Sequence, residues 1–265
     1  MSKNNKIFIL VFIVFILFIF FAKSSSENKK ENLISQEIES EEIYQFSTVN
    51  FNNTSFDVVK VESKNINSIK FYYKNKNNQK IETINQLKDL LKEQKKNLVF
   101  ATNGGIFSKE FKPLGLYIEN GKEISKINLN EGEGNFYFQP NGIFSIQNNK
   151  VEITESKKYQ NSSEVSFAIQ SGPMLLIDNK INSLFNEKSE NKHIRNGVGI
   201  TENGSVIFVI SNELVTFYNF ALFFKEDLNC KNALYLDGAI SEMYVSEQRK
   251  NVKNKFSVMI GIVDE

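Results

Sequence analysis

The sequence contains one histidine, His193, and one cysteine, Cys230. A single cysteine excludes an intramolecular disulfide and a cysteine-rich zinc site, and a single histidine excludes HExxH metalloproteases and multi-histidine metal sites. A Ser-His-Asp or Cys-His mechanism would have to run through His193 alone. G-x-S-x-G, P-loop and Rossmann motifs are also missing. We therefore expect chemistry based on carboxylates, arginine, amides and backbone groups, with no resident metal or cofactor.

Neither sign of charge is in excess. The 32 basic and 31 acidic side chains give a net charge of +1, whereas a nucleic-acid-binding surface normally needs a clear basic excess. The chain has 265 residues, 41% of them hydrophobic, which is enough for a sizeable core. These values predict one globular domain with an N-terminal extension and no nucleic-acid partner, and they leave the oligomeric state open.

An unbroken apolar run over residues 7–22 follows two lysines and ends at Lys23. As a helix it would be about 24 Å long, slightly short for a bilayer core and long for the apolar region of a signal peptide. The basic flank favours an N-in orientation with the remainder exported. No A-x-A-like cleavage site is clear near Ala22, which favours an uncleaved anchor over a cleaved signal. We thus predict a signal anchor or signal peptide over residues 1–23, and a membrane-anchored or secreted domain outside the cytoplasm.

The extension continues as a polar segment and is followed by the folded domain. Residues 24–43 are rich in Ser, Asn, Lys and Glu and hold too few apolar groups to fold, so they are predicted to be a linker. From residue 44 to residue 265 the pattern is of short strands broken by turn residues. Strands are expected over residues 56–61, 69–73, 98–101, 167–170, 174–177, 206–210 and 256–263, and the apolar run within residues 232–238 is expected to be a buried strand that ends at Asp237.

Helices are predicted over residues 83–96 and 216–229. Thr83 and Gln86 form a capping-box pair at the start of the first helix. Both segments carry an apolar stripe, formed by Ile84, Leu87 and Leu91 in the first and by Phe217, Phe220, Ala221, Phe224 and Leu228 in the second. Asn-Gly pairs, a strong hairpin signal, occur at 120–121, 141–142 and 203–204. The predicted fold class is α+β, a mixed and mainly antiparallel sheet with a few packed helices in a single domain.

Four glycine-containing breaks follow or interrupt the predicted strands. They are Asn103-Gly104-Gly105, Ser171-Gly172-Pro173, Arg195-Asn196-Gly197, and Asp237-Gly238 with Ser241 close behind. Glycines allow backbone N–H groups to converge on an anion, and Asn and Ser add neutral hydrogen bonds. The planar guanidinium of arginine can donate two parallel hydrogen bonds to a phosphate or carboxylate. The carboxylate of aspartate can act as a base or a nucleophile. Taken singly, each break is more often an ordinary turn, and the spacing leaves open whether they meet.

In this order, the four breaks and the residues around them resemble the phosphodiester glycosidase family. The resemblance rests on Asn103-Gly104-Gly105-Ile106-Phe107, Gln170-Ser171-Gly172-Pro173, Arg195-Asn196-Gly197-Val198-Gly199 and Leu236-Asp237-Gly238, and extends over about residues 100–244. Residues 113–118 and 218–221 resemble the exported bacterial branch. The chain departs from the lysosomal member, the uncovering enzyme, at Ala239-Ile240-Ser241, where that enzyme has a glycine-rich turn.

The resemblance implies a hydrolase that cleaves between a sugar anomeric carbon and a phosphodiester oxygen on a glycan or cell-surface polymer. Its partner would be a phosphorylated carbohydrate. Because a departing phosphate monoester is stable as an anion, a general acid is needed less than in ordinary glycosidases. Asp237 is the candidate base or nucleophile, and Arg195 is the candidate for holding the phosphate. The expected substrate-binding residues are Asn103, Gly104, Gly105, Ser171, Gly172, Asn196, Gly238 and Ser241.

Several alternatives remain open at this stage. Glu213 and Glu242 are the nearest candidates for a second carboxylate, although an exposed surface position is expected more often for both. A surface position is also expected for His193. Cys230 is expected to be a small buried side chain that fills space in the core. A divalent cation could bridge Asp237 and a substrate phosphate. A non-catalytic phosphoglycan- or cell-wall-binding module and an assembly factor for surface polysaccharide are the competing functions.

Overall fold

The computed structural model describes residues 42–237 and 240–264. The predicted signal segment and nearly all of the linker lie outside the described residues, and so does Gly238. Ile43–Glu265 form one compact unit. None of the helices in the described ranges has the length and apolar character needed to span a bilayer.

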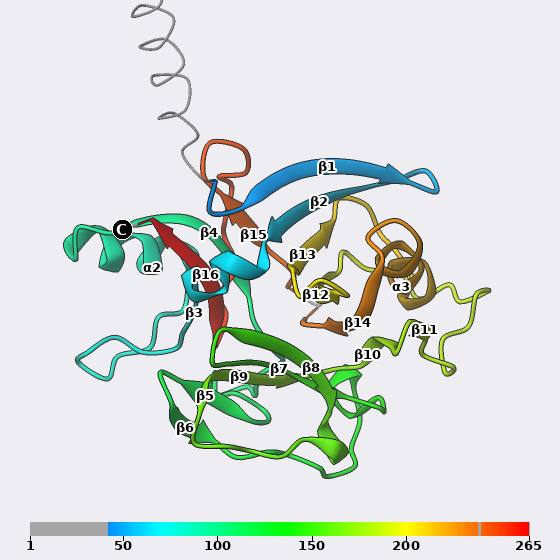
Figure 1. Cartoon of the computed structure of the whole chain (residues 1–265), viewed down its shortest axis with the longest axis horizontal. Helices are drawn as coiled ribbons and strands as arrows, with labels where there is room; N and C mark the ends of the chain where they lie inside the picture. The colour runs from blue at the N-terminus through cyan, green and yellow to red at the C-terminus, as the bar shows by residue number, and fades with distance from the viewer. Residues whose placement is uncertain (1–41, 238–239, 265) are drawn as a thin grey trace, which may run out of the picture. The chain divides into compact units, whose positions relative to one another are not determined.

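Three antiparallel sheets build the domain (Figure 1). The seven-stranded sheet runs β1 (Gln45–Phe51), β2 (Thr54–Val61), β13 (Val206–Ser211), β12 (Asn196–Thr201), β14 (Cys230–Tyr235), β10 (Met174–Ile177) and β11 (Lys180–Ile181). The four-stranded sheet runs β15 (Met243–Val245), β4 (Asn97–Asn103), β16 (Met259–Asp264) and β3 (Ile69–Tyr72). The five-stranded sheet runs β6 (Lys122–Ser125), β5 (Tyr117–Glu119), β9 (Val165–Ser171), β7 (Gly142–Gln147) and β8 (Lys150–Glu155).

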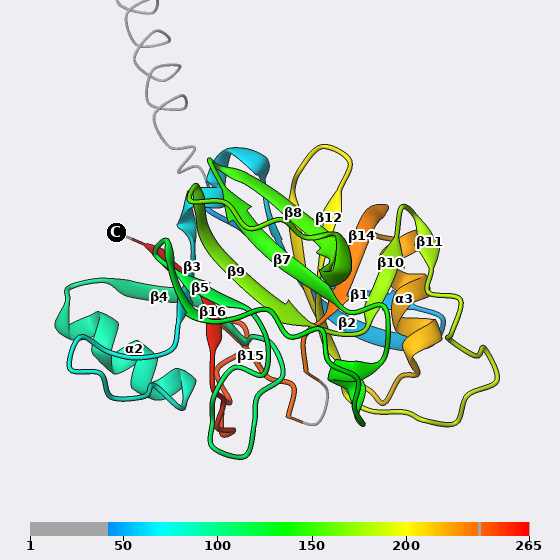
Figure 2. The same ribbon diagram turned by 90° about the horizontal axis from the view of Figure 1, so that it is seen from below.

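Among the described residues, two α-helices flank the sheets and three short 3₁₀ helices lie in the connections. Helix α2 (Ile84–Glu93) packs on β4, and α3 (Phe217–Glu226) packs on β10, β11 and β14. Figure 2 shows α2 and α3 on opposite sides of the domain, with β7, β8 and β9 between them in the view. The 3₁₀ helices are η1 (Ser63–Ser68), η2 (Asn135–Tyr137) and η3 (Ser156–Lys158). The described chain is thus β-rich, and the α+β expectation holds only approximately because the strands dominate and divide into three sheets.

The predicted capping box at the start of α2 is confirmed. The Thr83 hydroxyl accepts a hydrogen bond from the backbone N–H of Gln86, and the Gln86 side chain accepts one from the backbone N–H of Thr83. Both helices end earlier than predicted, α2 at Glu93 and α3 at Glu226. Lys95 and Asn229 follow within a few residues with φ of 61° and 50°. The left-handed backbone at these positions turns the chain away from the helix axis.

Most aromatic side chains lie in the core, as the sequence predicts. Phe71, Phe144 and Phe208 belong to the largest buried cluster. A second cluster lies between α3 and the seven-stranded sheet, where the ring centroids of Phe56 and Phe223 are 4.1 Å apart. Offset ring packing of this kind adds to the stability that apolar burial provides. The core therefore fixes α3 on the strands that carry the candidate site.

Asparagine supplies many of the hairpin turns. At Asn120-Gly121, which joins β5 to β6, both residues have positive φ, as a type I′ turn requires. The turns from β1 to β2, from β7 to β8 and from β10 to β11 use Asn52–Asn53, Asn148–Asn149 and Asp178–Asn179, all with positive φ. Asn141-Gly142 is not a hairpin turn, which corrects the sequence prediction. The buried Asn141 donates a hydrogen bond to the Phe136 carbonyl, and Gly142 begins β7.

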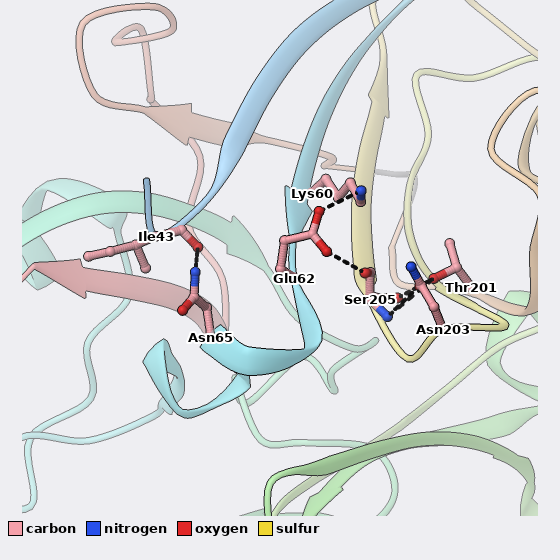
Figure 3. Close-up of polar contacts among 7 residues, drawn as sticks. All are labelled: Ile43, Lys60, Glu62, Asn65, Thr201, Asn203 and Ser205. Atoms are coloured by element: carbon pink, nitrogen blue, oxygen red, sulfur yellow. Dashed lines mark hydrogen bonds and ion pairs between the residues drawn. The ribbon is translucent and has the colours of Figure 1, made fainter. Parts of the chain in front are cut away.

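Polar contacts tie the end of β2 to the turn between β12 and β13 (Figure 3). The Glu62 carboxylate lies 2.6 Å from the Lys60 ammonium and accepts a hydrogen bond from the Ser205 hydroxyl at 3.2 Å. The hydrogen bond from Lys60 holds the pKa of Glu62 below its usual value. The Thr201 hydroxyl donates to Asn203 and accepts from the backbone N–H of Ser205. This network fixes the hairpin whose other end opens at the candidate site.

Candidate active site

The predicted breaks meet where the three sheets adjoin. Ser171 is the last residue of β9, and the cis Gly172–Pro173 bond lies between it and β10, so the chain passes there from the five-stranded to the seven-stranded sheet. Asn103 ends β4, and Asn196 begins β12. Asp237 follows β14, after which the chain crosses to β15 in the four-stranded sheet. The arrangement brings segments from all three sheets to one point.

The Asn196 side chain links these segments. Its amide nitrogen donates to the Thr102 hydroxyl at 3.0 Å and to the Asn103 side-chain oxygen at 3.0 Å. Its amide oxygen accepts from the backbone N–H of Asp237 and from the Ser241 hydroxyl, both at 3.1 Å. Asn196 and Asn103 are each only 1% exposed. The two amides therefore act first as buried supports that set the position of Asp237.

Hydrogen bonds to the backbone complete the support of Asp237. The Ser171 hydroxyl donates to the Leu236 carbonyl at 2.6 Å, and the Leu236 N–H donates to the Asn196 carbonyl at 3.1 Å. Ser241 donates to the Asp237 carbonyl. Asp237 itself is 8% exposed, so little of it is open to solvent.

The glycines of the predicted anion cradle serve close packing. The Gly104 N–H donates to the Val258 carbonyl at 2.9 Å, which corrects the expectation that this amide is available to a phosphate. A Cβ atom at Gly105 would lie 2.7 Å from the Gln170 carbonyl, and one at Gly172 would lie 2.5 Å from the Asn141 Cβ. Among the described glycines, only three others have positive φ, so Gly104, Gly105 and Gly172 do not. Here glycine is required by the space between strands rather than by an unusual backbone conformation.

Arg195 lies deeper than the sequence predicts. Its side chain is fully buried, with Nε donating to the Val215 carbonyl at 2.9 Å and Nη2 donating to Asn191 at 3.2 Å. Its guanidinium carbon lies 3.7 Å from the ring centroid of Phe217. Nη1 is buried and has no hydrogen-bond partner among the described residues. Arg195 is thus held against the start of α3 with one donor unused.

Tyr235 lies beside Arg195 and two residues before Asp237, and sequence reasoning did not select it as a site residue. Its ring centroid is 5.4 Å from the Arg195 guanidinium carbon. Its hydroxyl is buried and has no hydrogen-bond partner within the described part of the chain. Burial raises the pKa of Tyr235, the nearby Asp237 charge raises it further, and Arg195 opposes the rise. The charges of Arg195 and Asp237 therefore have opposite effects on the pKa of Tyr235.

The remaining candidates lie outside this cluster or support it. Glu242 is buried and accepts a hydrogen bond from the Lys253 N–H at 2.7 Å, while its own N–H donates to Asn103 at 2.8 Å. Burial raises the pKa of Glu242. Glu213 and His193 are exposed, in agreement with the surface expectation. Cys230 is buried, and burial raises the pKa of its thiol to about 12, as a filler position requires.

Gln170 is a further support that sequence reasoning did not assign. Its side-chain oxygen accepts from the backbone N–H groups of Leu116 and Asn128 at 3.0 and 2.9 Å. Its amide nitrogen donates to the Asn128 carbonyl at 2.7 Å. It precedes Ser171 in β9, and it belongs to the motif Gln170-Ser171-Gly172-Pro173, in which the sequence pattern assigned it no role. Its buried amide anchors the loop beside the five-stranded sheet.

Comparison with known proteins decides the family. A family model described as phosphodiester glycosidase matches residues 96–263. The chain belongs to the phosphodiester glycosidase family. The uncharacterized protein YigE of Escherichia coli (strain K12) is 40% identical to this chain over 177 residues, or 67% of this chain and 69% of YigE.

Solved structures share the fold at low sequence identity. The catalytic domain of zebrafish N-acetylglucosamine-1-phosphodiester α-N-acetylglucosaminidase, auto-inhibited by its pro-peptide, matches with a TM-score of 0.58 at 15% identity, over 86% of this chain and 85% of that one. A protein from Burkholderia pseudomallei K96243 matches with a TM-score of 0.52 at 9% identity, over 79% of this chain and 74% of that one. The phosphodiester glycosidase match includes the site described above, from Asn103 to Glu242. Membership therefore supports a glycosidase-like enzyme in general.

Proposed function

We propose that this chain is an exported or membrane-anchored hydrolase that releases a sugar from a sugar-1-phosphodiester on a glycan or cell-surface polymer. The observation that carries the proposal is the convergence of Asn196 and Ser171, which come from segments far apart in the sequence, on the Leu236–Asp237 backbone, where Ser241 also donates to the Asp237 carbonyl. Such support restricts the backbone of a residue that must present its carboxylate in one direction. The export rests on the apolar segment over residues 7–22.

Asp237 is the proposed base or nucleophile. As a base it would take a proton from water while the water oxygen attacks the anomeric carbon, and the bond from that carbon to the phosphodiester oxygen would break. The electron pair of that bond would leave with the phosphate monoester, which is a stable anion. As a nucleophile Asp237 would form a glycosyl ester that water then hydrolyses. Both routes place the departing negative charge at the phosphate.

Arg195 is proposed to stabilise that charge. Its guanidinium is held by Val215 and Asn191. The Tyr235 ring centroid is 5.4 Å from the guanidinium carbon, and the charge of Asp237 raises the pKa of Tyr235. A buried positive charge acts over a longer range than an exposed one because water screens it less. Arg195 thus supports catalysis by its charge at the phosphate, either through Nη1 directly or through Tyr235.

Turnover of defined diesters tests the proposal. The substrates are methyl diesters of sugar 1-phosphates, beginning with the N-acetylglucosamine derivative because the zebrafish protein's name specifies that sugar. We expect wild-type protein to release free sugar and methyl phosphate, and Asp237→Asn, which keeps the side-chain shape, to lower kcat by about 10²–10⁴-fold. Arg195→Ala should also abolish turnover, with circular dichroism used to check that the variant folds.

Two outcomes would count against the proposal. Wild-type rates in Asp237→Asn would remove Asp237 from the mechanism. Diester binding without product, in protein assayed both with and without added divalent cations, would favour the alternative of a non-catalytic phosphoglycan-binding module. Asn203→Ala, an exposed turn position in the β12–β13 hairpin, is the matched control and should keep the wild-type rate.

A further inference from the structure

A small cavity with aromatic walls lies between η2, the connection that follows β11 and the start of α3. Its volume is about 320 Å³, near the lower end of the range for pockets that hold small molecules. Phe138, Phe185 and Phe217 line it, and all three are partly exposed, unlike the core phenylalanines. The cavity therefore presents aromatic surface to a ligand.

The three rings are packed together. The ring centroids of Phe185 and Phe217 are 5.1 Å apart with an interplanar angle of 10°, and those of Phe138 and Phe185 are 6.0 Å apart at 28°. Aromatic rings have few rotatable bonds, so packing against one another holds them in place before a ligand binds. The cavity thus has a preformed apolar wall.

The polar groups of the cavity are neutral. Asn135, Asn186 and Asn191 contribute amides, and the lining contains no charged side chain among the described residues. An amide both donates and accepts hydrogen bonds, which suits hydroxyl groups. A pyranose ring has a C–H face that packs on aromatic rings and a rim of hydroxyls that pairs with amides. The chemistry of the cavity therefore fits a neutral sugar ring and not the phosphate.

The cavity adjoins the candidate active site through two residues of its wall. The Phe217 ring lies under the Arg195 guanidinium, and its centroid is 4.8 Å from that of Tyr235. Asn191 accepts a hydrogen bond from Arg195 Nη2 through both its carbonyl and its side-chain oxygen. Beside this wall lie the buried Arg195 guanidinium and the buried Tyr235 hydroxyl. A ligand in the cavity is therefore next to the positive charge proposed to act on the phosphate.

We propose that this cavity is a subsite for a neutral pyranose ring of the phosphodiester substrate. The inference rests on the proposed function for the linkage to the phosphate, but sugar binding by the cavity can be measured without turnover. The ring is either the sugar that is released or a sugar on the phosphate carrier, and two substrates distinguish these sources.

Ligand-observed saturation-transfer NMR on the full-length protein tests binding directly. The probes are the methyl glycosides of common hexoses and N-acetylhexosamines. We expect at least one probe to show transfer to its ring C–H protons with wild-type protein and to lose it in Phe185→Ala. Asn186→Ala is the second variant, because its exposed side chain can be removed without disturbing the core. Phe46→Ala, a partly exposed phenylalanine on β1, is the matched control and should keep the wild-type signal.

Kinetics identify the source of the ring. In Phe185→Ala, we expect kcat/KM to fall about tenfold, which corresponds to about 1.4 kcal/mol. A fall for both a methyl diester and a sugar-phosphate-sugar diester assigns the cavity to the released sugar, and a fall for the second substrate alone assigns it to the carrier.

The two proposals fail separately. Unchanged saturation transfer and unchanged kcat/KM in both cavity variants, in protein that turns over the diesters, would overturn the subsite while the proposed function stands. Absence of saturation transfer from every probe to the wild-type protein would also overturn it. If the protein binds sugar in a manner that depends on Phe185 but does not hydrolyse the diesters, the subsite would be supported and the proposed hydrolase function would be refuted.

Discussion

Removal of the Asn196 side chain should destabilise the whole domain, because this one amide joins three segments. In Asn196→Ala, the backbone N–H of Asp237 loses its acceptor at 3.1 Å, and the Asn103 side-chain oxygen loses a donor at 3.0 Å. The Thr102 hydroxyl loses a further donor at 3.0 Å. All of these groups are buried, so water cannot freely replace the lost partner.

The expected cost follows from the number of buried groups affected. A buried polar group that loses its partner costs about 1–3 kcal/mol. The Asn103 oxygen still accepts from the Glu242 N–H, and Thr102 still donates to the Glu242 carbonyl. The groups that lose their acceptor are the Asp237 N–H and the Asn103 side-chain nitrogen, which donates to Asn196 at 3.4 Å. For two such groups we expect about 2–5 kcal/mol. With a urea m-value of about 2.5 kcal/mol/M, the unfolding midpoint should fall by about 1–2 M.

Urea unfolding followed by circular dichroism and tyrosine fluorescence measures this loss. Asn203→Ala is the control: it also removes an asparagine that accepts two hydrogen bonds, but at an exposed turn. Its cost should stay within about 1 kcal/mol. A loss of stability in Asn196→Ala no larger than in Asn203→Ala would refute the view that Asn196 is a buried structural link.

Two further predictions concern titrating groups away from Asp237. Because burial raises the pKa of Cys230 to about 12, the folded protein at pH 8 should react with a thiol reagent at least about a hundredfold more slowly than the protein in urea; equal rates would contradict this. Burial also raises the pKa of Glu119 above 4.5, so the folded state binds its proton more tightly and stability should fall as the pH rises from about 4.5 through the folded pKa. Glu119→Gln, in which Tyr117 can still donate its hydrogen bond, should weaken this decline, and an unfolding free energy with the same pH dependence as wild type would count against it.

The elements of the fold were largely predictable because their signals are local. The apolar stripe Ile84, Leu87 and Leu91 is buried as predicted, and the capping box sets the start of α2. The pairing of strands is not local: β2 lies beside β13, with Phe56 opposite Ser211. No periodicity in the sequence specifies such a partner, so the division into three sheets could not be predicted. Turns such as Asn52–Asn53 were also not predicted. Asparagine can adopt positive φ, but its presence in a sequence is a weaker signal of a turn than glycine is.

The sequence predicted where the candidate site lies better than it predicted which side chains contact one another there. The four breaks meet as the family resemblance implies, but their side chains divide between two sides of the sheet. Arg195 and Asn196 are neighbours in an extended chain, so their side chains point to opposite faces. Asn196 therefore reaches Asn103, whereas Arg195 reaches Val215 and Phe217. Tyr235 was missed because an aromatic residue in an apolar strand looks like core until its hydroxyl is located.

The site is joined by contacts between residues far apart along the chain. Asn103 and the Glu242 N–H are separated by 139 positions, and Asn196 and Asp237 by 41. Closing loops of this length costs conformational entropy before any hydrogen bond repays it. A growing chain that ends at Asp237 would still lack both Glu242 and β16, the strand that pairs with β4. The order of synthesis therefore delays assembly of the site until β16 has been added.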